Sequence, residues 1–311
     1  MLEKNFKLKI TFIYFGISLF GTLFALFIFN RFTPLIDSEN YINGYYLTDL
    51  HFRTRFVQHI TSAITSLTNP LITHLTFSLF SAAAIFFYAL KSRNNSWLLL
   101  ILLLPSSLVW TSIAGKEAIF FGCVGIFLIL WIDLIKEKIS YRHLIIIIPF
   151  VICALLRPHY TVGLLWLAFS AFVLQKNSLT NSRIVYALII IIFFILIFGI
   201  LNYLMPDLAE RGIEAIDPTA KASRNVALNI ISLKSFISHL DTGMLFGIVG
   251  PFPIELLHRP EFIPFFIEGI IILVAPCTIG IFLFKKTRKT KNHIYFLNFI
   301  YGVVPAIIIV A

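Results

Sequence analysis

Charged residues are scarce in this chain, since only 13% of its 311 residues are Asp, Glu, Lys or Arg. Hydrophobic residues make up 59% of the sequence, including 33 Phe, and they gather in continuous runs. A helix of about 20 apolar residues crosses the hydrocarbon core of a bilayer, and continuous rather than alternating runs select helices. The composition therefore predicts an all-α integral membrane protein.

Cysteine is also rare, and the three cysteines have no spacing typical of a disulfide framework or a metal site. The histidines show no HExxH spacing, so we predict no metal site. The sequence also lacks a P-loop, a dinucleotide fingerprint and a serine nucleophile elbow. No cofactor is evident. A dependence on Mg²⁺ stays open, although no residue pattern supports it.

About nine apolar segments are predicted to cross the membrane within one polytopic domain, residues 1–311. They are the ranges 10–29, 70–90, 96–114, 118–135, 143–157, 160–175, 184–204, 262–284 and 293–311. The first has a basic start like a signal peptide but no convincing cleavage site, so we interpret it as a retained anchor. The chain ends inside an apolar run, so whether the native protein continues past Ala311 is open.

An N-terminus in the cytoplasm makes every short inner segment basic, as the positive-inside rule requires. The net charge of +10 is then a topology signal rather than a sign of nucleic-acid binding. Two longer segments, at about 30–69 and 205–261, fall on the outer face. A stripe of apolar residues between 226 and 240 predicts an amphipathic surface helix in the second, and the first could form similar short helices.

Ten basic residues fall outside the inner segments, against the positive-inside bias. They are Arg31, Arg53, Arg55, Lys116, Arg157, Arg211, Lys221, Arg224, Lys234 and Arg259. A partner that carries phosphate would explain them, because Arg and Lys bind phosphate oxygens. Solvated loop charges, or side chains that snorkel to lipid headgroups, would explain them too.

Two of these basic residues occupy tight turns. Residues 143–175 must hold two spans and a turn, so each arm reaches only about 24 Å, less than the roughly 30 Å core. Arg157 in that turn should then face a polar cavity or an anion, unless the arms borrow interfacial residues. Lys116 lies in the turn Gly115-Lys116-Glu117, where Glu117 could neutralise it or the lysine could join Arg157 in a shared outer cavity.

Carboxylates occur at the same outer end. Asp37 and Glu39 follow the first span and could supply a general base or a metal ligand, or they could simply begin a solvated loop. Glu255 ends the segment Gly250-Pro251-Phe252-Pro253-Ile254-Glu255, whose prolines predict a rigid entry to the next span. Glu268 lies inside that span, where a carboxylate needs a partner, and the outer-face arginines are candidates.

Four segments resemble parts of the polytopic membrane enzymes of bacterial surface-polysaccharide assembly. These are the O-antigen and capsule repeat-unit polymerases and the related GT-C glycosyltransferases. The segments are Asp37-Ser38-x-x-Tyr41, Pro105-Ser-Ser-Leu-Val-Trp110 running into Gly115-Lys116-Glu117, Arg157-Pro158-His159, and Gly250-Pro251-Phe252-Pro253-x-Glu255. The resemblance implies a GT-C-like bundle in the bacterial cytoplasmic membrane that acts on glycans linked to polyprenyl phosphate or diphosphate. Membrane lipid and other polysaccharide-assembly proteins are the partners it implies.

The charged residues and the resemblance together predict an outer-face glycosyl-transfer site. A base is expected among Asp37, Glu39 and His159. The expected phosphate-binding residues are Lys116, Arg157, Arg224 and Arg259, and the expected supporting residues are Glu117, Glu255 and Glu268. A transporter or flippase for a lipid-linked or anionic substrate stays open as an alternative, as does a non-catalytic assembly subunit.

Overall fold

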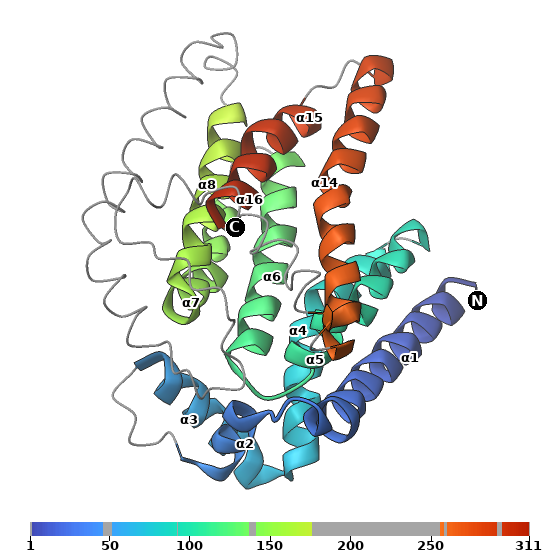
Figure 1. Cartoon of the computed structure of the whole chain (residues 1–311). Coiled ribbons are helices and arrows are strands. Elements are labelled where there is room, and N and C mark those ends of the chain that lie inside the picture. The colour runs from blue at the N-terminus through green and yellow to red at the C-terminus, as the bar shows by residue number, and fades with distance from the viewer. Residues whose placement is uncertain are drawn as a thin grey trace.

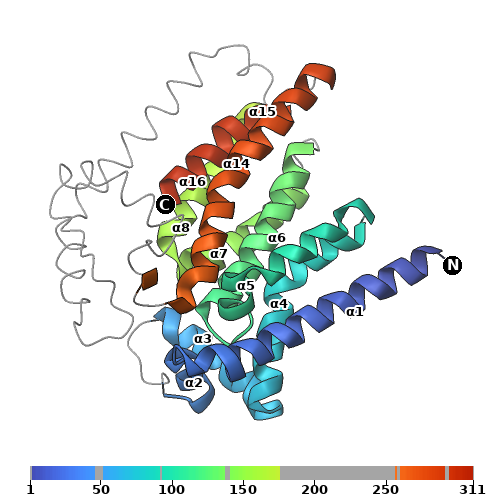
Figure 2. The same ribbon diagram turned by 45° about the vertical axis from the view of Figure 1, so that its right-hand side comes forward.

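The computed structural model describes residues 2–45, 52–91, 93–136, 141–175, 256–257, 260–290 and 294–310. Every element in this part of the chain is helical. Figures 1 and 2 show these helices arranged as one bundle. The predicted span 184–204 and the amphipathic stretch 226–240 lie outside the described residues.

Four helices in the described part are long and apolar enough to cross a membrane. They are α1 (Leu2–Leu23, extended by a π turn over Phe24–Ile28 and a 3-10 turn over Phe29–Arg31), α4 (Pro70–Lys91), α6 (Lys116–Lys136) and α14 (Ile263–Thr290). Many of their large apolar side chains stay exposed in the bundle, as expected of surfaces that face lipid.

Three shorter apolar helical segments accompany them. They are α7 (Ile147–Leu156, after a 3-10 turn over Tyr141–Ile146), α8 (Pro158–Gln175), and a C-terminal run made of α15 (Ile294–Asn298), a π turn (Phe299–Val303) and α16 (Val304–Val310). The prediction of an all-α membrane protein is confirmed. The number of nine spans stays a prediction, because the described residues contain four long candidate spans.

The predicted span 96–114 is wrong as a single helix. It consists of a 3-10 helix (Arg93–Leu103) followed by the short helix α5 (Pro105–Trp110). Pro105 causes the break, because the residue before a proline is kept out of the helical region. Leu104 accordingly has an extended backbone, with φ −62° and ψ 140°.

This broken segment carries the chain back across the bundle between two parallel helices. The start of α4 contacts the start of α6, where the Ala114 N–H donates to Nδ1 of His74 at 3.0 Å. At the far ends of the same helices, Lys91 Nζ lies 4.0 Å from Asp133 Oδ2. Lys91 and Lys136 therefore share one end of the bundle, and Lys116 lies at the other.

The non-helical residues between α5 and α6 are packed inside the bundle, so their backbone groups need partners from side chains. Hydroxyls of α1 and α4 and the imidazole of α4 supply them. The bonds run from Ser81 Oγ to the Thr111 carbonyl (2.9 Å), from Thr22 Oγ1 to the Ser112 carbonyl (3.1 Å), and from the Ala114 N–H to His74. These polar residues of α1 and α4 thus stabilise a broken helix.

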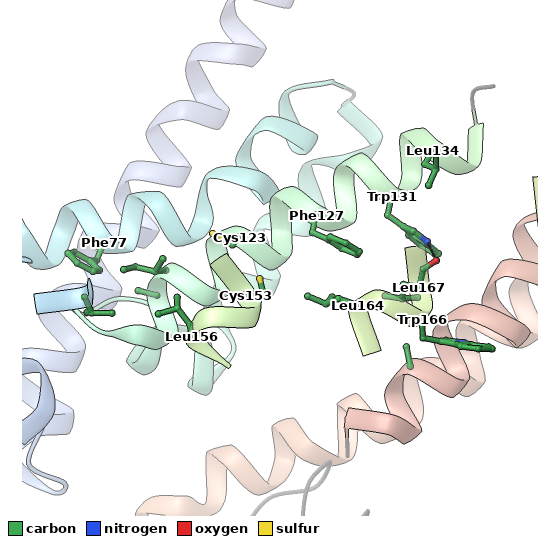
Figure 3. Close-up of a cluster of buried hydrophobic side chains, with 14 of the residues drawn as sticks. Phe77, Cys123, Phe127, Trp131, Leu134, Cys153, Leu156, Leu164, Trp166 and Leu167 are labelled. Atoms are coloured by element: carbon green, nitrogen blue, oxygen red, sulfur yellow. Dashed lines mark hydrogen bonds between the residues drawn. The ribbon is translucent and has the colours of Figure 1, made fainter. Parts of the chain in front are cut away.

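The main core lies where α6 packs on the α7–α8 hairpin, as Figure 3 shows with Phe127, Cys153 and Leu164. Trp131 of α6 donates its indole N–H to the Leu167 carbonyl of α8 at 2.8 Å. This bond and the buried aromatic rings fix α8 against α6. The fixed hairpin determines where the turn between α7 and α8 is placed.

Two short helices cover one end of the bundle, α2 (Ile36–Asn43) and α3 (Phe52–Leu67). Gly44 ends α2 in the left-handed conformation, with φ 79°, which glycine adopts without steric cost. Figures 1 and 2 show both helices beside the end of α1 and the start of α6. The first long segment thus forms short helices over its described residues, and its place on the outer face stays a prediction.

Candidate functional site

Charged side chains converge where α2 and α3 meet the start of α6 and the turn between α7 and α8. Lys116, the first residue of α6, interacts electrostatically with four of them. They are Asp37 of α2, Arg53 of α3, Glu117 of α6 and Arg157 of the α7–α8 turn. These five residues are called the Lys116 cluster below.

Arg157 and Glu117 form the direct contact of this cluster. Nη2 of Arg157 donates to Oε1 of Glu117, and the two side chains are 35% and 40% exposed. Lys116 and Arg157 therefore lie at the same end of the bundle, as the sequence predicted. That they face a shared polar groove stays a prediction. Glu117 was expected to neutralise Lys116. It interacts electrostatically with Lys116 but also forms an ion pair with Arg157.

Local sequence explains how Arg157 is placed. It is the single residue between α7 and α8, with φ −143° and ψ 75°, and Pro158 disfavours a helical conformation at this position. Its N–H donates to the Cys153 carbonyl at 2.8 Å, and its carbonyl accepts from Thr161 Oγ1 at 3.2 Å. Both helix ends therefore hold the backbone of Arg157, which aims the guanidinium at α6.

The two carboxylates of α2 have different surroundings. Asp37 belongs to the Lys116 cluster. Oε1 of Glu39 accepts a hydrogen bond from Asn30 Nδ2 at 3.2 Å, and Oδ1 of the same Asn30 accepts from the Leu35 N–H at 2.7 Å. Glu39 thus helps to fold the link between α1 and α2, whereas Asp37 interacts electrostatically with Lys116.

A buried hydrogen bond joins α2 and α3, the two helices that carry Asp37 and Arg53 of the cluster. Nε2 of Gln58 donates to the Tyr41 carbonyl at 2.6 Å, and both residues are buried. The Tyr41 ring lies 6.0 Å from Nζ of Lys116, within range of a cation–π contact. Asp37 and Tyr41 are four residues apart, which places them on one face of α2. The sequence pointed to Tyr41 only within a motif and to Arg53 only among the ten basic residues outside the inner segments. It did not single out Gln58.

Glu268 is not part of the cluster. It is 5% exposed, and its Oε2 accepts a hydrogen bond from the Ser106 N–H at 2.8 Å. Ser106 lies in the first turn of α5, where backbone N–H groups have no partner within the helix. The partner that the structure gives to Glu268 is this backbone group rather than an outer-face arginine, and the contact ties α14 to α5.

An apolar groove lies at the same end of the bundle, between the end of α1, α5 and the start of α14. It encloses about 480 Å³ and is lined by Phe24, Ile28, Phe29, Phe32, Pro105, Leu108, Val109, Pro260, Glu261, Pro264 and Phe265. We call it the α1–α5–α14 groove. Two of its lining residues, Phe29 and Val109, pack with Leu35 in one buried cluster. Leu35 is two residues before Asp37 in the chain, so the packing around the groove extends to the start of α2.

Three predicted site residues, Arg224, Glu255 and Arg259, lie outside the described residues. The backbone of His159 is in the first turn of α8, next to Arg157, and the surroundings of its side chain are not described. In the part of the chain that the structure describes, no three His, Cys, Asp or Glu side chains gather as metal ligands would.

The cluster contains three cations and two carboxylates. Glu117 pairs with one of the cations, Arg157, and Asp37 is the other carboxylate. Such a set can bind an anion through Lys and Arg and can accept a proton at Asp37. Comparison with known proteins adds no further constraint, because no protein-family model, curated protein or solved structure matches this chain.

Proposed function

We propose that this protein is a membrane glycosyl-transferring enzyme that acts on glycans linked to polyprenyl phosphate or diphosphate. Within that class, we propose a repeat-unit polymerase of O-antigen or capsule type. The observation that carries the proposal is the Lys116 cluster, in which a carboxylate and several cations gather at one end of a helical bundle. The segments that resemble surface-polysaccharide enzymes contribute four of its five residues.

The chemistry assigns a role to each charge. In the transfer, an acceptor hydroxyl attacks the anomeric carbon, and the bond between that carbon and the carrier phosphate breaks. Asp37 would take the hydroxyl proton. Lys116, Arg53 and Arg157 would stabilise the negative charge that develops on the leaving phosphate. Cleavage of the phosphate–sugar bond drives the reaction, so a nucleotide site is not required.

The α1–α5–α14 groove fits a carrier that stays in the bilayer. Its wall is formed mainly by Phe, Leu, Ile, Val and Pro side chains, which suits a hydrocarbon chain. It also shares the residues Phe29 and Val109 with the packing around Leu35, close to Asp37. We propose that a lipid chain binds in this groove with its phosphate directed to the basic residues.

The finer topology belongs to the same proposal. We propose about nine spans in a GT-C-like bundle, with the N-terminus and the end that contains Lys91 and Lys136 in the cytoplasm of a bacterium. The Lys116 cluster would then lie at the outer face of the cytoplasmic membrane. His159 as an alternative base, Arg224 and Arg259 as further phosphate ligands, and Glu255 as a supporting residue complete the proposed site.

Deletion of the gene tests this function. A repeat-unit polymerase is required for chain growth, so the deletion strain should carry surface glycan reduced to single repeat units. Complementation with the intact gene should restore the long chains. Full-length glycan in the deletion strain would refute the proposal.

A transporter or flippase for a lipid-linked or anionic substrate is the second candidate. The broken helix between Leu104 and Lys116 favours it, because interrupted helices line the substrate sites of many transporters. The hydroxyls of Thr22 and Ser81 donate hydrogen bonds to backbone carbonyls at this break, which argues that the polar residues there have a structural role. Reconstitution in liposomes separates the two: a transporter moves the lipid-linked glycan between leaflets without lengthening it.

A further inference from the structure

Helix α3 buries several polar side chains and exposes a large aromatic ring beside basic side chains. The side that packs on the bundle is mostly polar, with Thr54, Gln58 and Thr61 beside Val57. The rings of Phe52 and Phe56 stack with centroids 6.3 Å apart, and Phe56 is partly buried against the main core. Phe52 is 58% exposed. An exposed ring beside basic side chains is expected where an apolar medium meets a polar one.

A second cavity of about 480 Å³ lies on this outward face. It is lined by Phe52, Arg55, Phe56, His59, Ile60 and Ala63. Arg55 and His59 are both exposed and lie four residues apart, so they are neighbours on the helix. The face therefore presents a patch of aromatic and aliphatic groups bordered by a cation and an imidazole.

The position of α3 places this face at a membrane boundary. A turn at Thr68 and Asn69 leads from α3 directly into the span α4, and the Asn69 side chain accepts a hydrogen bond from the Ile72 N–H at 2.9 Å. Figures 1 and 2 show α3 beside the start of α6 at one end of the bundle. At such a boundary, apolar groups meet acyl chains while basic groups reach the headgroups.

We propose that the outward face of α3 binds an anionic phospholipid. Phe52 contacts the acyl chains, and the partly buried Phe56 and Ile60 form the floor of the cavity. Arg55 donates hydrogen bonds to the phosphate. His59 donates a further hydrogen bond to the headgroup. Neither Arg55 nor His59 belongs to the Lys116 cluster, so the inference does not depend on the proposed enzymatic function.

The first test identifies what touches this face. The photoreactive residue p-benzoylphenylalanine is introduced at position 52 of the full-length protein, which is illuminated in vesicles of phosphatidylglycerol and phosphatidylcholine. Mass spectrometry should find cross-links to lipid, enriched in phosphatidylglycerol over its share of the vesicle. Cross-links to a peptide of this chain or to a second copy would overturn the proposal, as would labelling that follows the vesicle composition.

The second test measures the contribution of the charges. Native mass spectrometry counts the phosphatidylglycerol retained by the detergent-purified protein. Loss of one basic contact near an anionic surface lowers affinity about fivefold. We therefore expect about fivefold weaker retention for Arg55→Gln and little change for Arg55→Lys. The matched control is Lys9→Gln, which removes an exposed cation from α1. Equal losses in Arg55→Gln and Lys9→Gln would refute a specific site.

Aromatic variants complete this test. Phe52→Ala should lower lipid retention, whereas Phe12→Ala should not, although Phe12 is the more exposed ring at 69% against 58%. Gel filtration and circular dichroism establish that each variant is folded. Unchanged retention in both a folded Phe52→Ala and a folded Arg55→Gln protein would show that α3 holds no lipid.

Discussion

The ion pair between Arg157 and Glu117 is expected to stabilise the fold as well as the site. A hydrogen bond to a charged group contributes about 1.5–3 kcal/mol when buried, and an exposed ion pair rarely exceeds about 1 kcal/mol. The two side chains are 35% and 40% exposed, so solvent screens part of their attraction. We therefore expect a coupling energy of about 1–2 kcal/mol between them.

A double-mutant cycle measures this coupling. The stabilities of Arg157→Ala, Glu117→Ala and the double variant are compared with that of the unaltered protein by steric trapping in bicelles. The chain offers a matched control in Lys91 and Asp133, whose charged atoms are 4.0 Å apart and whose side chains are 56% and 34% exposed. That pair should couple by less than about 0.5 kcal/mol.

The result that would refute the reasoning is equal coupling in the two pairs. In that case Arg157 would not be held by Glu117, and the account of how the α7–α8 turn aims its guanidinium would fail. A charge exchange gives a second readout. Glu117→Arg combined with Arg157→Glu should recover part of the stability that either substitution alone removes.

Three further predictions concern topology, the broken helix and the phosphate contact. Reporter fusions should place positions 93, 140, 180 and 288 in the cytoplasm and positions 50 and 230 outside; an inner location for position 230 breaks the nine-span proposal. His74→Leu should lower the unfolding free energy by about 1–3 kcal/mol, because the Ala114 N–H loses its partner, while Thr76→Val on the exposed face of α4 should change it little. Arg157→Ala should cost about 2–4 kcal/mol of transition-state stabilisation, and Arg157→Lys should retain more activity since the charge survives; equal rates for the two variants would argue against a phosphate contact.

The long helices could be predicted from the sequence because burial in a bilayer leaves a simple signal. A run of about 20 apolar residues is typical of a membrane span and rare in soluble proteins, and α1, α4, α6 and α14 lie where such runs occur. The break after Leu104 could not be read from hydropathy, because a broken segment inside the bundle is as apolar as a continuous one. The residues that indicated the break were Pro105 and the hydroxyl residues after it.

The proximity of Lys116 and Arg157 follows from topology alone, since consecutive turns at one face of a bundle come close together. The choice of partners does not follow in this way. Arg53 joins the cluster through the packing of α3, and Glu268 binds the Ser106 N–H because α14 lies against α5. Both depend on tertiary contacts between residues far apart in the chain, which a single sequence does not reveal.

The structure also separates two carboxylates that the sequence left equivalent. Asp37 and Glu39 are two residues apart on a short helix, and either could serve as a base. Asn30 holds Glu39 at 3.2 Å, whereas Asp37 interacts with Lys116. This difference makes Asp37 the stronger choice for the base and gives Glu39 the role of a matched control.

Surface-glycan length in strains that carry Asp37→Asn or Glu39→Gln tests the central claim most directly. Both substitutions remove one negative charge with little change in shape, and membrane abundance of each variant is measured alongside. The account predicts that Asp37→Asn, at normal abundance, yields single repeat units, and that Glu39→Gln yields long chains. Full-length glycan from the Asp37→Asn strain would contradict the role of the Lys116 cluster in glycosyl transfer.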